Sequence, residues 1–194
     1  NSPTKRASLG VSPGDFVVGK IARLFELKGH DDLFAIAPRL AKRIPNIRFL
    51  LVGDGVLRGR FERLAKEIGC GQNFIFTGLV PPSEIPSLVG VMDALVHLSR
   101  REGLPRALPQ AMAAAKPVVA FDCDGAGEVC LDGKTGHLIE PGDLPKLEER
   151  LAKLANDAPL RTALGQAGRK VVEEEFTVEQ LVERQYELYK RLLA

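Results

Sequence analysis

The chain has 194 residues, a length that predicts one large domain or a tight two-layer pair, and 45% of them are hydrophobic and 27% charged, ordinary globular values that argue against a fibrous or disordered protein. Its 27 basic and 25 acidic residues leave a net charge of only +2, which gives no general field for binding nucleic acid or an anionic membrane. No apolar run reaches the roughly 18 residues that would span a bilayer, and the first residues lack the apolar core of a signal peptide.

Short apolar runs alternate with helical patterns along most of the chain. An apolar run bounded by turn formers predicts a buried strand, and apolar residues at every third or fourth position predict a helix. In chain order, we predict a strand at 16–21, a helix at 31–44, a strand at 47–52, a helix at 57–68, a strand at 73–76, a short helix opening at 81–84, a strand at 94–98, a helix at 106–115, a strand at 117–121, one helical turn near Glu128, a strand at 136–139, and three closing helices at 143–154, about 160–174 and 178–193.

This alternation predicts an α/β fold. Strands separated by single helices need crossover connections, so the sheet should be parallel and doubly wound, with helices on both faces, followed by C-terminal helices. Ligands of such sheets bind beyond the carboxyl ends of the strands. We therefore look for function in the five strand-to-helix loops, at 22–30, 53–56, 77–83, 99–106 and 122–128.

The first loop carries two cations, Arg23 and Lys28, five residues apart. Two cations near a helix N-terminus would hold a phosphate well, whereas the alternative is a pair of solvated surface charges. In the second loop, Gly53-Asp54-Gly55 nearly opens a GxGxxG motif, but Arg58 takes the place of the third glycine. We interpret these glycines as a tight turn and keep nicotinamide-dinucleotide binding as a less favoured alternative.

The fourth loop is the most informative. Glu102 and Gly103 precede a predicted helix start, where free backbone N–H groups would face an anion. Gln110 follows Glu102 by eight residues, about two helical turns, so the pair could contact two ends of one nucleotide-sugar ligand. The alternative is an acid that caps the helix and a buried Gln that bonds the backbone.

Other polar residues are weaker candidates. Asp122 and Asp124 could bind a metal, but Asp-Cys-Asp-Gly is also an ordinary turn, which we favour. His30, His97 and His137 are scattered with no nucleophile motif beside them, so we interpret them as structural.

The cysteines and the first residue indicate the setting of the chain. Cys70, Cys123 and Cys130 are odd in number and lack CxxC spacing, so they predict neither a disulfide framework nor a zinc site and fit a reducing cytosol. The chain opens on Asn1 instead of Met, which leads us to expect a fragment of a longer protein.

Seven short motifs, taken in order, carry a resemblance to a known family. They are Arg23-Leu24 with Lys28-Gly29, Val52 to Gly55, Thr77 to Val80, Glu102 to Pro105, Gln110 to Ala113, Lys116 to Val119, and Asp132 to Gly136. The set resembles the C-terminal, donor-binding domain of a family 4 (group 1) retaining glycosyltransferase of GT-B architecture, from about Leu9 to Tyr189. The resemblance implies a Rossmann-like sheet and hexosyl transfer without metal or cofactor.

The resemblance assigns roles to individual residues. It implies that Arg23 and Lys28 hold the diphosphate of a nucleotide sugar and neutralise the leaving group, and that Glu102 lies close to the transferred sugar. Residues of the fourth loop would add backbone N–H donors, and the third loop would contact the base. The substrate-binding residues implied in this way are Gly53, Leu79, Val80, Gly103, Leu104, Arg106 and Gln110.

Two residues depart from the family pattern. Gln110 stands where the family has a second Glu that bonds the ribose hydroxyls; its amide has one acceptor and two donors for a diol but lacks the charge. Pro105 replaces a common Gly, which removes one backbone donor and fixes φ near the helix start. Gln110 keeps open an alternative function, a non-catalytic nucleotide-binding or interaction module that retained the fold.

The resemblance also implies how the chain is organised. We expect residues 1–10 to be the remnant of an interdomain linker and residues 11–176 to form the nucleotide-sugar-binding domain. Residues 177–194 would be a helix that crosses back to a missing N-terminal domain, with its tyrosines and leucines partly exposed. We expect a cytoplasmic protein whose isolated chain is inactive, and leave open a peripheral membrane association through the missing domain.

Overall fold

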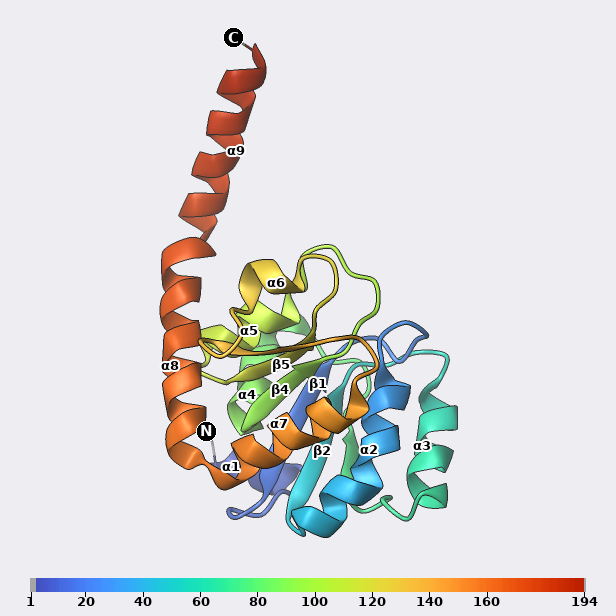
Figure 1. Cartoon of the computed structure of the whole chain (residues 1–194). Helices are drawn as coiled ribbons and strands as arrows, with labels where there is room; N and C mark the ends of the chain where they lie inside the picture. The colour runs from blue at the N-terminus through green and yellow to red at the C-terminus, as the bar shows by residue number, and fades with distance from the viewer. Residues whose placement is uncertain (1–2, 194) are drawn as a thin grey trace.

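The computed structural model describes residues 3–193 (Figure 1). Its elements, in chain order, are α1 (Pro3–Ser8), β1 (Phe16–Ile21), α2 (His30–Arg43), β2 (Ile47–Val52), α3 (Arg58–Glu67), β3 (Phe74–Phe76), the 3-10 helix η1 (Pro82–Glu84), α4 (Ile85–Val91), β4 (Ala94–His97), α5 (Ala107–Ala113), β5 (Val118–Phe121), α6 (Ala126–Val129), β6 (Gly136–Ile139), α7 (Leu144–Asn156), α8 (Ala158–Glu175) and α9 (Val178–Leu193). Every predicted strand and helix is present, with ends that shift by one or two residues; only α1 was not foreseen.

The six strands form one parallel sheet in the order β3-β2-β1-β4-β5-β6. The predicted doubly wound, Rossmann-like parallel sheet is therefore confirmed. The chain winds outward from β1 on one side and from β4 on the other, so the order reverses between these two strands. A ligand crevice is expected at this reversal, where the loops after β1 and β4 diverge.

Helices cover both faces of the sheet, because alternate residues of each strand point to opposite sides (Figure 1). Val18 of β1 joins an apolar cluster with α2, α3 and α7, whereas Val17 joins a second cluster with α4 and α5. On the first face, Phe34 of α2 stacks on Phe61 and Phe74, with ring centroids 5.1 and 4.2 Å apart.

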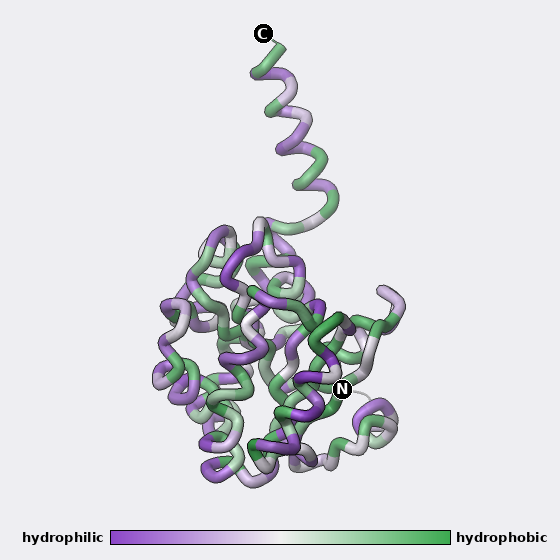
Figure 2. Tube along the Cα trace, turned by 90° about the vertical axis from the view of Figure 1, so that its right-hand side faces the viewer, coloured by the Kyte–Doolittle hydropathy of each residue, from purple (hydrophilic) through white to green (hydrophobic). Residues whose placement is uncertain are grey.

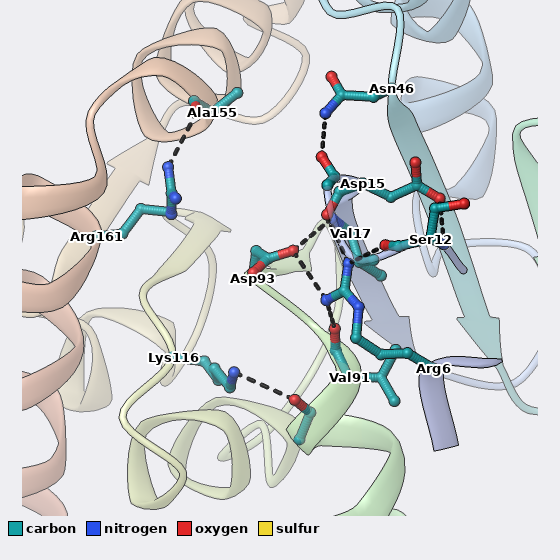
Figure 3. Close-up of polar contacts among 12 residues, drawn as sticks. Arg6, Ser12, Asp15, Val17, Asn46, Val91, Asp93, Lys116, Ala155 and Arg161 are labelled. Atoms are coloured by element: carbon teal, nitrogen blue, oxygen red, sulfur yellow. Dashed lines mark hydrogen bonds and ion pairs between the residues drawn. The ribbon is translucent and has the colours of Figure 1, made fainter. Parts of the chain in front are cut away.

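Arg6 fastens α1 to the amino ends of the strands (Figure 3). Its guanidinium donates to the carbonyl oxygens of Val91 at 2.9 Å and Asp15 at 2.6 Å, and pairs with the Asp93 carboxylate at 3.5 Å. Asp93 also accepts the N–H of Val17 at 2.8 Å, so one carboxylate serves both α1 and β1.

The expected linker remnant therefore contains a helix that contacts the folded body. Residues 3–8 form this helix, and residues 1 and 2 lie outside the described residues. Whether the segment belongs to an interdomain linker stays a prediction.

The last helix, α9, extends away from the rest of the molecule (Figure 1), and none of its described residues is buried. Apolar and polar residues alternate along it (Figure 2). Its apolar side includes Val178, Leu181, Val182, Tyr186 and Tyr189, each more than half exposed. The exposure of its tyrosines and leucines is as expected, whereas its contact with another domain stays a prediction. Within residues 3–193, no helix has the length and apolar character needed to cross a membrane.

The loop after β1 lies directly against the end of β4. At Gly29, a Cβ atom would lie 1.9 Å from the carbonyl oxygen of Leu98, and the residue has a φ of +64°. Glycine is thus required twice, for the left-handed backbone and for the close approach.

Gly29→Ala should therefore destabilise the chain more than Gly10→Ala. Gly10 has nearly the same φ, +67°, but a Cβ atom added there would meet no other atom within 4 Å. The left-handed conformation costs Ala about 1 kcal/mol at both sites, and the steric conflict adds about 1–3 kcal/mol at Gly29. Urea denaturation of both variants measures the difference, and equal losses would contradict the close approach.

Candidate functional site

A cavity of about 690 Å³ opens at the carboxyl ends of β1 and β4. Seven of the ten predicted site residues line it: Arg23, Lys28, Val80, Glu102, Leu104, Arg106 and Gln110. A smaller cavity of about 370 Å³ lies at the amino ends of the strands, near Asp93 and Arg161 (Figure 3), and holds none of the predicted site residues.

The other three predicted residues lie outside the cavity lining. Leu79 is 86% exposed, and Gly103 is exposed in the loop after β4. Gly53 donates its N–H to the carbonyl oxygen of Gly78 at 3.2 Å, and a Cβ there would lie 2.3 Å from the carbonyl oxygen of Ala22. Its role in the structure is thus to let the loop after β2 pack on the loop after β1.

The remaining features of the second loop agree with a tight turn. At Gly55, a Cβ would lie 2.4 Å from the carbonyl oxygen of Leu24. Arg58, which takes the place of the third glycine of the dinucleotide motif, pairs with Asp54 at 3.1 Å and with Glu62 at 2.8 Å. Packing therefore accounts for both glycines without a dinucleotide.

Lys28 and Glu102 form an ion pair at the cavity, with 2.5 Å between Nζ and Oε2. Burial opposes ionisation of Glu102, but the hydrogen bond and charge of Lys28, with smaller effects from His97 and Ser99, outweigh it and hold the pKa of Glu102 below its usual range. Glu102 is thus a carboxylate at neutral pH, and the charge of Lys28 is balanced.

Two other cations of the cavity differ from Lys28 in this respect. Among residues 3–193, neither Arg23 nor Arg106 forms an ion pair with an acidic side chain. Gln110 lies one turn beyond Arg106 on α5, so this neutral side chain leaves the guanidinium without an acidic neighbour at that position. The cavity therefore keeps an excess of positive charge, which suits an anionic ligand.

The alternative interpretation of the fourth loop is wrong. Within the described part of the chain, no side chain caps α5, which begins at Ala107 after Arg106, so Glu102 is not a capping acid. Gln110 is exposed to the cavity and not buried. Both residues thus line the cavity, Glu102 in its ion pair with Lys28.

An unforeseen ion pair ties the first turn of α2 to the loop after β4, and hydrogen bonds to Leu27 tie the loop after β1 to the same loop. Arg100 donates to both carboxylate oxygens of Asp32, at 2.7 and 2.9 Å, and its backbone N–H donates to the carbonyl oxygen of Leu27 at 2.8 Å. The Ser99 hydroxyl donates to the same carbonyl at 3.3 Å. No pattern in the sequence signals this pair, because 68 residues separate its members.

The loop after β5 supports the fourth loop from the other side. The N–H of Glu102 donates to the Asp124 carboxylate at 2.6 Å, and the N–H of Gly125 donates to the carbonyl oxygen of Gly103 at 3.2 Å. Asp124 itself lies in a turn, so the turn interpretation of Asp-Cys-Asp-Gly is confirmed.

Sequence reasoning also missed Lys20, which lies in β1 with only 1% of its surface exposed. Burial lowers the pKa of Lys20 to about 7; Asp32 and Glu102 oppose the change and Lys28 adds to it. Burial and the nearby lysines also lower the pKa of His30 to about 3 and that of His97 to about 4, so both imidazoles are neutral. A lysine inside the apolar run 16–21 was the available signal.

Comparisons with known proteins agree with this geometry. The sequence profile described as glycosyl transferases group 1 matches residues 1–171. A GDP-mannose-dependent alpha-(1-6)-phosphatidylinositol monomannoside mannosyltransferase of Mycolicibacterium smegmatis is 32% identical over 172 residues, which are 85% of this chain and 44% of that protein. The chain spans about half the length of the curated relatives that it matches.

Solved structures give the same result. The Anabaena protein HepE in complex with UDP has a TM-score of 0.88 and 26% identity, covering 98% of this chain and 54% of HepE. The C-terminal domain of LpcC, a group 1 protein of Francisella tularensis, has a TM-score of 0.82 at 24% identity and covers 92% of this chain and 94% of that domain, which shows a shared fold.

The buried charge of Lys20 predicts a pH-dependent stability. Lys20 has the ordinary pKa of 10.5 in the unfolded chain and a pKa of about 7 in the folded chain. Between these two pH values the unfolded chain binds the proton more tightly, so the free energy of unfolding decreases as pH falls from 10.5 to 7. Lys20→Met should therefore raise the free energy of unfolding at pH 7, on the order of 2–4 kcal/mol, because each pKa unit is worth about 1.4 kcal/mol.

Urea denaturation of Lys20→Met and wild type from pH 7 to 10 measures this gain, which should shrink as pH rises. Lys42→Met is the matched control, since Lys42 is exposed on α2. A gain that stays constant over this pH range would show that protonation of Lys20 does not lower the free energy of unfolding.

Proposed function

Because the chain belongs to the group 1 glycosyltransferases, we propose that it is the donor-binding half of an enzyme that transfers a hexosyl group from a nucleotide-diphosphate sugar to an acceptor with retention of configuration. The observation that carries the proposal is the charge arrangement of the cavity. Arg23 and Arg106, which pair with no acidic side chain of residues 3–193, share the cavity with the Lys28–Glu102 pair. The complex of HepE, a protein of the same fold, with UDP supports the binding of a nucleotide by this chain.

Each residue of the cavity has a role in this proposal that follows from its chemistry. Arg23, with Lys28, binds the diphosphate and neutralises the negative charge that grows on the leaving group as the glycosidic bond breaks. Glu102, ionised beside Lys28, faces the transferred sugar. Gln110 bonds the ribose hydroxyls through its amide, and the backbone near Leu79 and Val80 contacts the base. In this proposal the cations stabilise the leaving group without a metal or cofactor.

The proposal includes a second domain. Acceptor-binding residues belong to an N-terminal domain outside this chain, so the 194 residues alone should bind a donor without transferring sugar. The exposed apolar side of α9 would pack on that domain. If the acceptor is a lipid, the same N-terminal domain would make the peripheral contact with the membrane. Binding and transfer assays would identify the sugar, the base and the acceptor.

Arg23→Ala should weaken donor binding by tenfold or more, since a charge-assisted contact to phosphate is worth about 1.5–3 kcal/mol. Isothermal titration of the chain with UDP, UDP-glucose, GDP and GDP-mannose measures it. Arg101→Ala is the matched control, because Arg101 is an exposed cation of the loop after β4 that does not line the cavity. Binding of none of these ligands below millimolar concentration would overturn the donor site.

A non-catalytic module is the second candidate, and Gln110 is the observation that favours it. In the whole protein that contains this chain, we expect sugar transfer with a kcat of about 1 s⁻¹ or more, and a loss of at least about a hundredfold in Glu102→Gln. A wild-type protein without turnover, made active by Gln110→Glu, would instead establish the module. The measurement is release of nucleoside diphosphate in the presence of acceptor.

A further inference from the structure

We propose that Asp124 is a positioning residue that holds Glu102 in the orientation needed to contact the donor sugar; this inference rests on the proposed function. Asp124 belongs to the loop after β5 and lines no part of the donor cavity. It acts through the backbone of Glu102, 22 residues away in the chain, whose N–H donates to its carboxylate at 2.6 Å.

The contact holds a part of Glu102 that Lys28 does not touch. Lys28 holds the side chain through Oε2, whereas Asp124 holds the backbone N–H. The neighbouring hydrogen bond from Gly125 to the carbonyl oxygen of Gly103 runs between the same two loops. A Cβ on Gly125 would lie 2.6 Å from that oxygen, so the loops touch at van der Waals distance.

The backbone of Asp124 is in the left-handed region, which Asp tolerates and glycine adopts without steric cost. Asp124 has a φ of +49°, and only Leu27 and Ala115 share a positive φ among the non-glycine residues of 3–193. Such residues are uncommon, and glycine would adopt this conformation more readily. Glycine would lack the carboxylate that reaches Glu102.

A second non-glycine residue with positive φ supports the fourth loop from its other side. Leu27, at a φ of +66°, presents its carbonyl oxygen to the N–H of Arg100, two residues before Glu102. Two of the three non-glycine residues with positive φ in the described ranges thus supply acceptors to one loop, from its two neighbours. The Asp124 carboxylate interacts with the Cys123 thiol in its own turn and accepts the N–H of Glu102 from a different loop.

Asp124→Gly separates the role of the carboxylate from the stability of the fold, because it removes the acceptor and at the same time relieves the positive φ. We expect an unchanged or higher Tm, an approximately tenfold loss of affinity for UDP-glucose or GDP-mannose, whichever the wild type binds, and affinity for UDP or GDP within about twofold. Ala115→Gly is the matched control, since it relieves a φ of +53° after α5, outside the cavity lining, and should change neither affinity.

Two further variants test whether Asp124 acts through Glu102. Asp124→Asn, which keeps an acceptor oxygen and tolerates positive φ, should restore most of the nucleotide-sugar affinity. The loss in Asp124→Gly should also largely disappear when Glu102 is already Gln, so the double variant should lose little more than Glu102→Gln alone.

The outcomes distinguish this inference from the function on which it rests. If the wild type binds no nucleotide or nucleotide sugar, the donor site itself is wrong and the role of Asp124 falls with it. If the wild type binds and Asp124→Gly weakens UDP and UDP-glucose equally, or adds its full effect to Glu102→Gln, the donor site stands and the positioning role is overturned.

Discussion

The contact between the loops after β1 and β4 is the constraint on which the candidate site depends. These strands are neighbours in a parallel sheet, so both loops leave it at the same edge. Gly29 lets the first loop approach the carbonyl oxygen of Leu98, and this approach brings Lys28 within 2.5 Å of Glu102 across 74 positions of sequence. A larger residue at Gly29 would collide with the backbone of Leu98, so the two loops could not approach as closely.

Both burial and ion pairing determine the protonation states of the titratable groups in this region. Three cations line the cavity, Arg23, Lys28 and Arg106, and Glu102 balances one of them. Lys20 lies buried in β1 with a pKa of about 7, so it is only partly charged at neutral pH. Burial, with a smaller contribution from the nearby lysines, keeps His30 and His97 neutral, whereas the hydrogen bond and charge of Lys28 lower the pKa of Glu102. Such a site is prepared for an anion before the anion arrives, which reduces the reorganisation needed on binding.

Much of the fold followed from local patterns. The apolar runs and helical periods located all six strands and the helices between them, because burial on a sheet or on one helix face imposes a period that the sequence must carry. The predicted ends of the helices were less accurate than their positions. The helix α8 begins at Ala158, two residues before its predicted start, because the Asp157 side chain caps the N–H of Leu160. The helix α1 was missed because its stability comes from Arg6, whose partners lie as far away as Val91 and Asp93.

The sequence by itself determined the parallel sheet, the loops in which to look for a site, and seven residues that line one cavity. Only the tertiary structure decided which polar residues around the cavity touch. The pairing of Asp32 with Arg100 and the hydrogen bond from Glu102 to Asp124 join positions 68 and 22 residues apart. Hydrophobic periodicity is a local property that each segment carries alone, whereas polar contacts between loops exist only after packing has set the loops side by side.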